Sequence, residues 1–101
     1  MQWSASGLDR LIGILDFIAR ESPAAARQVV DDLLARVEVL AEHPRIGPVF
    51  SKDSGPELRR LILGKYIVVY QVQEAKRLVS VIAVRHSRQR SLTIEDLADD
   101  L

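Results

Sequence analysis

The most pointed chemical feature of the sequence is a cationic run near its end, Arg85-His86-Ser87-Arg88-Gln89-Arg90. Its guanidinium groups could bind phosphates, and the imidazole could transfer a proton near neutral pH. The alternative is structural, with His86 packed against a sheet and the arginines paired with acidic residues of the tail. Strand alternation would place Ile82, Val84 and His86 on one face. Because the first two are apolar, the pattern favours the packed interpretation.

Two further groups lie on strands that the sequence predicts upstream. Arg59 and Arg60 are adjacent, so their side chains should point to opposite faces, one buried and paired and the other exposed. An aromatic stripe on the next strand is more typical of a core than of a platform for stacking bases. Four alternate residues make up this stripe: Tyr66, Val68, Tyr70 and Val72.

Other catalytic chemistries find little support. The two histidines, His43 and His86, lack the spacing of a metal site, and the chain has no cysteine. Glycine-rich phosphate loops and a serine nucleophile elbow are absent from the sequence. We therefore expect no metal and no cofactor.

The elements that position these residues form one small domain. The chain has 101 residues, of which 48% are hydrophobic, and this suits a single domain over residues 1–101. No apolar run reaches the roughly 20 residues of a membrane span, and the N-terminus lacks a signal-type apolar segment. These features predict a soluble, cytoplasmic protein without a membrane partner.

Charge is unevenly spread, although the formal net charge is zero. Residues 1–50 hold 5 Lys/Arg and 7 Asp/Glu, residues 51–90 hold 9 and 3, and residues 91–101 hold only 4 Asp/Glu. The basic middle segment suggests an anionic partner, or a tail that folds onto its own basic face. Solvated surface charge is the remaining interpretation.

Two helical patterns open the chain. Apolar residues at positions 8, 11, 12, 15 and 18 have the spacing of one face of an amphipathic helix. Ser22-Pro23 ends this helix and provides the N-cap and first residue of a second helix, which ends near His43-Pro44. The short link between the helices predicts an antiparallel hairpin.

The pattern changes to loop and strands after His43. We expect a loop over residues 44–56, strands over 58–63, 66–72 and 78–84, and a further edge strand over 1–4. The links between the three main strands are of hairpin length. The prediction is an α+β fold in which an N-terminal antiparallel helical hairpin packs on one face of a small antiparallel β-sheet.

The tail over residues 92–101 predicts a short acidic helix capped by Thr93. Its carboxylates would screen the cationic run, so deletion of the tail should leave stability nearly unchanged and alter target affinity. The alternative is a hydrophobic brace on the sheet, made by Leu92, Ile94 and Leu97.

Four stretches, in this order and at this spacing, resemble one known family. They are Leu11-x-x-Ile14-x-x-Phe17-Ile18 with Ser22-Pro23-Ala24-Ala25-Ala26; Leu40-Ala41-Glu42-His43-Pro44-Arg45-Ile46-Gly47; Glu57-Leu58-Arg59-Arg60 before Tyr66-Ile67-Val68-Val69-Tyr70-Gln71-Val72; and Val81-Ile82-Ala83-Val84-Arg85-His86-Ser87-Arg88. Together they resemble the ParE/RelE superfamily, the toxins of bacterial type II toxin–antitoxin systems associated with plasmid stabilization. The resemblance implies two helices on an antiparallel sheet and a cognate antitoxin that wraps the toxin and silences it.

The superfamily has two branches, and the resemblance favours one of them. RelE-type members resemble ribosome-dependent mRNA endonucleases, whereas ParE-type members resemble inhibitors of DNA gyrase. Ile67 stands where the endonuclease branch carries an arginine, and residues 92–94 lack the tyrosine often found there. The ending Val84-x-His86-x-Arg88 is more similar to ParE. We therefore favour a non-catalytic, gyrase-directed toxin over an mRNA endoribonuclease, with a degenerate toxin in an antitoxin-bound repressor complex as a further alternative.

The resemblance and the charge pattern together suggest sites and partners. The antitoxin should bind by groove packing or by strand addition at an open sheet edge, the target is gyrase or ribosome-bound mRNA, and a homodimer is an alternative assembly. The predicted target-binding residues are Arg59, Arg60, Lys65, Arg85, His86, Arg88 and Arg90. An endonuclease would use Arg60, Arg85, His86 and Arg88. The predicted antitoxin-binding residues are Ile14, Phe17, Tyr66 and Tyr70.

Overall fold

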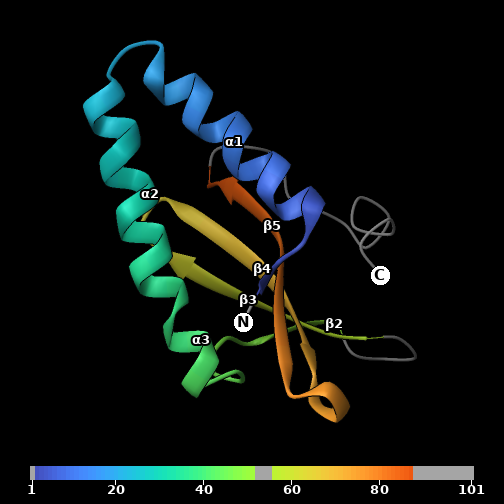
Figure 1. Cartoon of the computed structure of the whole chain (residues 1–101). Helices are drawn as coiled ribbons and strands as arrows, with labels where there is room; N and C mark the ends of the chain where they lie inside the picture. The colour runs from blue at the N-terminus through green and yellow to red at the C-terminus, as the bar shows by residue number, and fades with distance from the viewer. Residues whose placement is uncertain (1, 52–55, 88–101) are drawn as a thin grey trace.

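The computed structural model describes residues 2–51 and 56–87. Two long helices lie on one side of a five-stranded sheet, so the predicted α+β fold is confirmed (Figure 1). The predicted tail helix over residues 92–101 lies outside the described residues. The elements in chain order are β1 (Gln2–Trp3), α1 (Ala5–Ala19), α2 (Pro23–Val37), α3 (Val39–Glu42), β2 (Val49–Ser51), β3 (Glu57–Leu63), β4 (Tyr66–Gln73), a 3-10 turn (Glu74–Lys76) and β5 (Leu78–His86).

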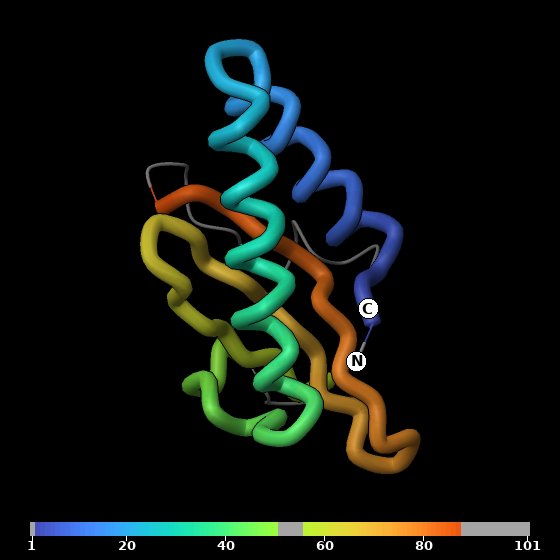
Figure 2. The backbone as a smooth tube through the Cα atoms, turned by 60° about the vertical axis from the view of Figure 1, so that its left-hand side comes forward, coloured from blue at the N-terminus to red at the C-terminus, as the bar shows by residue number. Residues whose placement is uncertain are grey.

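Serine caps begin both long helices of the antiparallel hairpin (Figure 2). The Ser4 hydroxyl accepts a 2.9 Å hydrogen bond from the N–H of Gly7, and the Ser22 hydroxyl accepts one of 3.1 Å from the N–H of Ala25. Pro23 is the first residue of α2, as predicted. The second predicted helix is divided at Glu38, after which α3 continues for one turn to Glu42. In the described part of the chain, no helix is long and apolar enough to cross a membrane.

The buried face of α1 differs from the predicted stripe. Leu11 is buried and Leu15 packs against the core, as predicted, but Leu8 and Ile12 are exposed, and Ile14 packs against the core as well. Gly7 explains this rotation, because a Cβ at that position would overlap the Val81 carbonyl of β5. The close approach of helix and strand therefore turns Gly7, Leu11 and Ile14 inward, at the i, i+4, i+7 spacing of one face.

The strand order is β1-β5-β4-β3-β2. Strands β3, β4 and β5 form the predicted antiparallel meander, whereas β1 pairs in parallel with β5 and makes the sheet mixed. Part of the segment predicted as a loop is strand β2, which pairs with Leu58 and Arg59 of β3. The prolines and glycines around it masked a strand of only three residues, Val49–Ser51.

Because β5 contains a β-bulge, its residues are distributed between the two faces of the sheet differently from the prediction. Val69 pairs with Ala83 but Tyr70 pairs with Val81, so Ile82 is the extra residue of the bulge. Ile82 and Ala83 both join the outer face, away from the helices, where they pack with Val69 and Leu58. The expectation that Ile82 shares a face with Val84 and His86 was wrong, because simple alternation fails at a bulge.

The main core lies between the helices and the inner face of the sheet. The aromatic stripe of β4 belongs to it, which confirms the core interpretation of that pattern. Leu33, Val37 and Leu40 of the helices are at most 2% exposed against this face. Burial of such side chains supplies most of the favourable free energy of folding, at about 1.5–3 kcal/mol each.

Candidate partner-binding site

An apolar cleft of about 590 Å³ lies between the helical hairpin and the end of the sheet. Helices α1 and α2 supply its apolar wall, and the β3–β4 turn and the end of β5 supply the opposite wall. Phe17 projects at its mouth with 72% of its surface exposed. The lining residues are Ile14, Phe17, Ile18, Val29, Lys65, Tyr66 and His86.

The β3–β4 turn positions the basic and aromatic residues of this cleft. Leu63 pairs with Tyr66 around a two-residue turn, and Gly64 adopts φ +62°, a left-handed conformation that favours glycine. Tyr66 pairs in turn with His86 of β5, and the two rings meet edge to face with centroids 5.4 Å apart. Burial raises the pKa of Tyr66, so its phenol stays neutral at physiological pH and offers a hydrogen-bond donor to the cleft.

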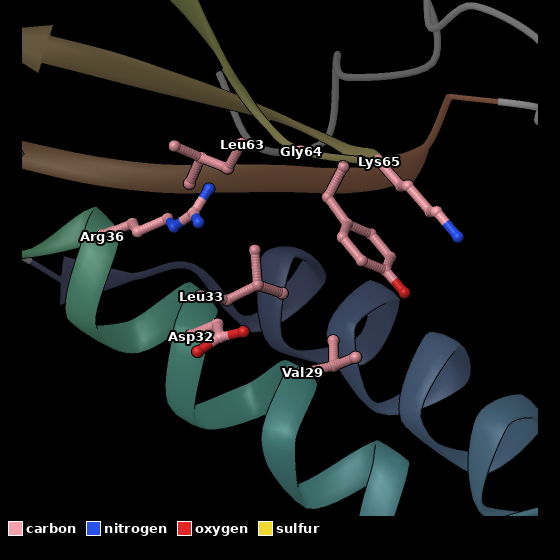
Figure 3. Close-up of a pocket in the computed structure, with 8 residues that line it drawn as sticks. Val29, Asp32, Leu33, Arg36, Leu63, Gly64 and Lys65 are labelled. Atoms are coloured by element: carbon pink, nitrogen blue, oxygen red, sulfur yellow. The ribbon is translucent and has the colours of Figure 1, made fainter.

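A smaller cleft of about 140 Å³ continues the first one along α2 (Figure 3). The two share Val29, Lys65 and Tyr66. Arg36 reaches from α2 toward Leu63, while Lys65 extends outward from the turn (Figure 3). The result is one continuous groove with an apolar floor and charged side chains at its rim.

Three of the four predicted antitoxin-binding residues meet in this groove. Ile14, Phe17 and Tyr66 come from separate parts of the chain and line the same cleft. Tyr70 does not belong to it, because its side chain is 0% exposed in the core. The predicted surface is therefore corrected to the first three residues, and their role in antitoxin binding remains a prediction.

Tyr70 has a different task, which is to hold the loop that follows α3. Its hydroxyl accepts a 3.0 Å hydrogen bond from the N–H of Gly47. Burial raises the pKa of Tyr70, so the phenol remains neutral. Gly47 is itself buried, and a Cβ there would overlap the Arg60 carbonyl and crowd the Tyr70 hydroxyl. The loop is thus pinned against β3 and β4 by a glycine that no larger residue can replace without displacement.

Arg59 strengthens the same loop and is not a surface residue. Its Nε donates a 2.6 Å hydrogen bond to Glu57, and its Nη1 donates one of 2.8 Å to the Gly47 carbonyl. Arg45 completes the cluster with an ion pair of 3.2 Å to Glu57. These cations, with the hydrogen bond from Arg59 as the largest contribution, lower the pKa of Glu57, whose side chain is 9% exposed. Of the two adjacent arginines, Arg59 is the paired one and is half-buried, whereas Arg60 is exposed.

The other predicted target-binding residues are divided between two faces. Arg60 pairs with Val69 and Arg85 pairs with Ile67, so both lie on the outer face of the sheet. His86 lies on the opposite, helix-facing side, within the cleft. Lys65 lies at the turn between the faces, and Arg88 and Arg90 lie outside the described residues. The structure therefore separates Arg60 and Arg85 from His86 rather than gathering them around one point where a phosphate could react.

Sequence reasoning missed part of this arrangement. Ile18 was predicted to belong to the apolar stripe of the first helix, and Val29 was not predicted as a site residue, although both line the cleft. Lys65 was predicted only as a target contact, yet it lies at the rim of the apolar groove. The glycine-tyrosine contact between positions 47 and 70 joins distant segments, and no local pattern indicates it.

Comparison with known proteins settles the family. Residues 1–91 match the family described as "ParE toxin of type II toxin-antitoxin system, parDE". The chain is a member of the ParE toxin family. This ParE-family toxin also resembles a solved structure titled "Chromosomal ParDE TA system from P. aeruginosa", with a TM-score of 0.67 and 18% sequence identity over 84% of this chain and 91% of the other. No curated protein matches the ParE-family toxin significantly.

Proposed function

We propose that this toxin acts in the cytoplasm on DNA gyrase without catalysing a reaction of its own, and that a cognate antitoxin neutralises it. The cleft beside Phe17 carries the proposal for the antitoxin. A large apolar side chain with 72% of its surface exposed, at the mouth of an apolar hollow, is typical of a partner-binding surface.

The placement of the charged groups supports a binding role over RNA cleavage. Cleavage through a 2′-hydroxyl needs a base, an acid and a cation around one phosphate. Arg60 and Arg85 face away from His86, with the sheet between them. The outer face instead carries the exposed guanidinium of Arg60. Such a face suits electrostatic attraction to an acidic surface of a protein target.

The test uses purified toxin with relaxed plasmid, gyrase and ATP, beside a cell-free translation reaction. We expect loss of supercoiling or accumulation of cleaved DNA, with translation unaffected. The variant Arg60→Glu should weaken the inhibition, whereas Arg27→Glu, an exposed arginine of α2 outside the groove, should not. Cleavage of transcripts within minutes of induction, with supercoiling unchanged, would overturn the gyrase proposal.

Neutralisation is tested separately by expressing the small reading frame that adjoins the toxin gene. Its product should form a stable complex with the toxin and relieve growth arrest. Replacement of Phe17 by serine should weaken that complex and leave gyrase inhibition intact. A toxin that is harmless alone and binds nothing encoded beside it would contradict the proposal.

A further inference from the structure

One side of strand β3 is only partly covered. Strand β4 pairs with all of Glu57–Leu63, whereas β2 pairs with Leu58 and Arg59 alone. The N–H of Arg60 then donates a 3.1 Å hydrogen bond to the Pro48 carbonyl. Beyond that bond, no strand of the described ranges lies beside residues 61–63. Within the part of the chain that the structure describes, the sheet therefore has an open edge at residues 61–63, next to the β3–β4 turn.

The hairpin register shows which backbone groups this edge presents. In a two-residue hairpin, the residues that flank the turn exchange both of their hydrogen bonds. Leu63 pairs with Tyr66 in this position, so Leu63 and Leu61 bond to β4. The N–H and C=O of Ile62 must then point away from β4. Among residues 2–51 and 56–87, no strand pairs with Ile62 on that side, since β2 pairs with Leu58 and Arg59 only.

The side chains around this edge are unusual for an unprotected strand. Natural edge strands are commonly blunted by charge, proline or a bulge at the exposed position. Here the outward position is Ile62, which is 65% exposed on the outer face of the sheet. On the inner face, Leu63 borders the smaller cleft beside Arg36 (Figure 3). An added strand would find an apolar contact on each side, one at Ile62 and one at Leu63.

The charges at the edge favour a partner over a second copy of this chain. Arg36, Arg60 and Lys65 are exposed around it, and Asp32 is the acidic residue that lines the adjoining cleft. Antiparallel pairing of two copies about Ile62 would bring Arg60 of each copy beside the Gly64-Lys65 turn of the other. Like charges at such positions destabilise a strand pair. An extended segment that carries carboxylates has the complementary charge.

We propose that the edge at Arg60–Leu63 accepts an extended strand of the antitoxin, and that this strand alternates apolar residues with acidic ones. The inference rests on the proposed antitoxin partner and specifies how it binds. The backbone of the partner bonds to the N–H and C=O of Ile62, its apolar side chains contact Ile62 and Leu63, and its carboxylates lie beside Lys65 and Arg60. Main-chain bonds give affinity in this binding mode, while the alternating side chains give selectivity.

Amide hydrogen exchange at Ile62 is the direct test, measured by NMR on the full chain with and without the product of the adjoining small gene. We expect the Ile62 amide to exchange freely in the toxin alone and to slow by roughly 100-fold or more in the complex. The amide of Leu61 serves as the internal control, because it is already bonded to β4 in the free protein. A stable complex in which the Ile62 amide stays unprotected would refute strand addition and leave the antitoxin partnership intact.

A matched pair of variants tests the hydrogen bond from the Ile62 N–H through its effect on the affinity for the antitoxin. Ile62→Pro removes the outward N–H, and proline is tolerated at an edge whose N–H faces solvent. Ile62→Thr shortens the side chain but keeps the donor. We expect the proline variant to bind the antitoxin about 5-fold or more weakly than the threonine variant. Equal affinities, with both variants folded by circular dichroism, would count against the proposal, and absence of any complex with the unaltered toxin would overturn both it and the antitoxin proposal.

Discussion

The ring of His86 meets the ring of Tyr66 edge to face, at an interplanar angle of 88° and a centroid distance of 5.4 Å. The contact joins the end of β5 to the start of β4 and forms one wall of the cleft that Phe17 borders. An imidazole in this position shapes a binding surface.

Replacement of His86 therefore tests whether its imidazole forms a wall of the binding cleft or takes part in catalysis. His86→Phe keeps an aromatic edge against Tyr66 and should retain antitoxin affinity within a few-fold. His86→Ala removes that wall and should weaken binding by about 0.5–1.5 kcal/mol. Both variants should still inhibit gyrase. Calorimetric titration with the antitoxin gives the affinities, and a loss of toxicity in both variants would indicate instead that the imidazole acts in the toxic step.

Phe17 should be a dominant contact of the antitoxin. Because Phe17 is 72% exposed, Phe17→Ser should leave the melting temperature nearly unchanged. The antitoxin complex should weaken by about 2 kcal/mol or more, roughly 30-fold in Kd. Ile12→Ser is the matched control, since Ile12 is 53% exposed on α1 but does not line the cleft. Equal losses of affinity in the two variants would indicate a surface much wider than the cleft.

The contact between Gly47 and Tyr70 should matter for stability and not for binding. Tyr70→Phe removes the acceptor of the Gly47 N–H and should lower the free energy of unfolding by about 1 kcal/mol. Gly47→Ala must displace the Arg60 carbonyl or the Tyr70 hydroxyl and should cost about 1–3 kcal/mol. Urea titrations measure both. Gly13→Ala is the control, because a Cβ at that helical position meets nothing within 4 Å.

Glu57 should make stability depend on pH in the acid range. Its pKa is lower in the folded protein than the ordinary value of 4.5, because Arg59 and Arg45 bind the charged form. The stabilisation is therefore fully present above about pH 4.5 and is lost as the pH falls through the lower, folded pKa. Glu57→Gln should lower stability at pH 7 by about 1.5–3 kcal/mol and flatten the acid limb of the urea-midpoint curve. Glu21→Gln, at an exposed position between the helices, should leave that limb unchanged.

Local patterns in the sequence predicted most of the fold. The 3.6-residue spacing of apolar side chains, the Ser22-Pro23 boundary and the β-branched runs of β4 and β5 each act over a few neighbouring residues. The errors arose where contacts between segments distant in the sequence determine which face of a helix is buried or whether a strand forms. The rotation of α1 depends on how closely Gly7 approaches Val81, and strand β2 exists only because β3 lies beside it.

The candidate site was predictable to the extent that its residues stand out by type. Ile14 and Phe17 are apolar residues outside the expected stripe of their helix, and Tyr66 begins a strand. These features were enough to predict each of them as a partner-binding residue. Tyr70 has the same residue type and alternation as Tyr66. Its burial depends on the loop at Gly47, which is distant in the sequence. The division of Arg85 from His86 follows from adjacency in a strand, but which of them faces the helices depends on the bulge upstream.

That bulge makes the number of residues in β5 matter as much as their identities. With Ile82 as an extra residue, Val84 and His86 return to the side of Val81, and Arg85 points outward. Without the bulge, plain alternation of all the residues beyond Val81 would exchange the two faces for everything that follows. Arg85 would then enter the cleft, and His86 would join the cationic outer surface. Deletion of one residue at positions 82–83 would instead remove the bulge and leave Arg85 on the outer face and His86 in the cleft, because the residue removed is the extra one.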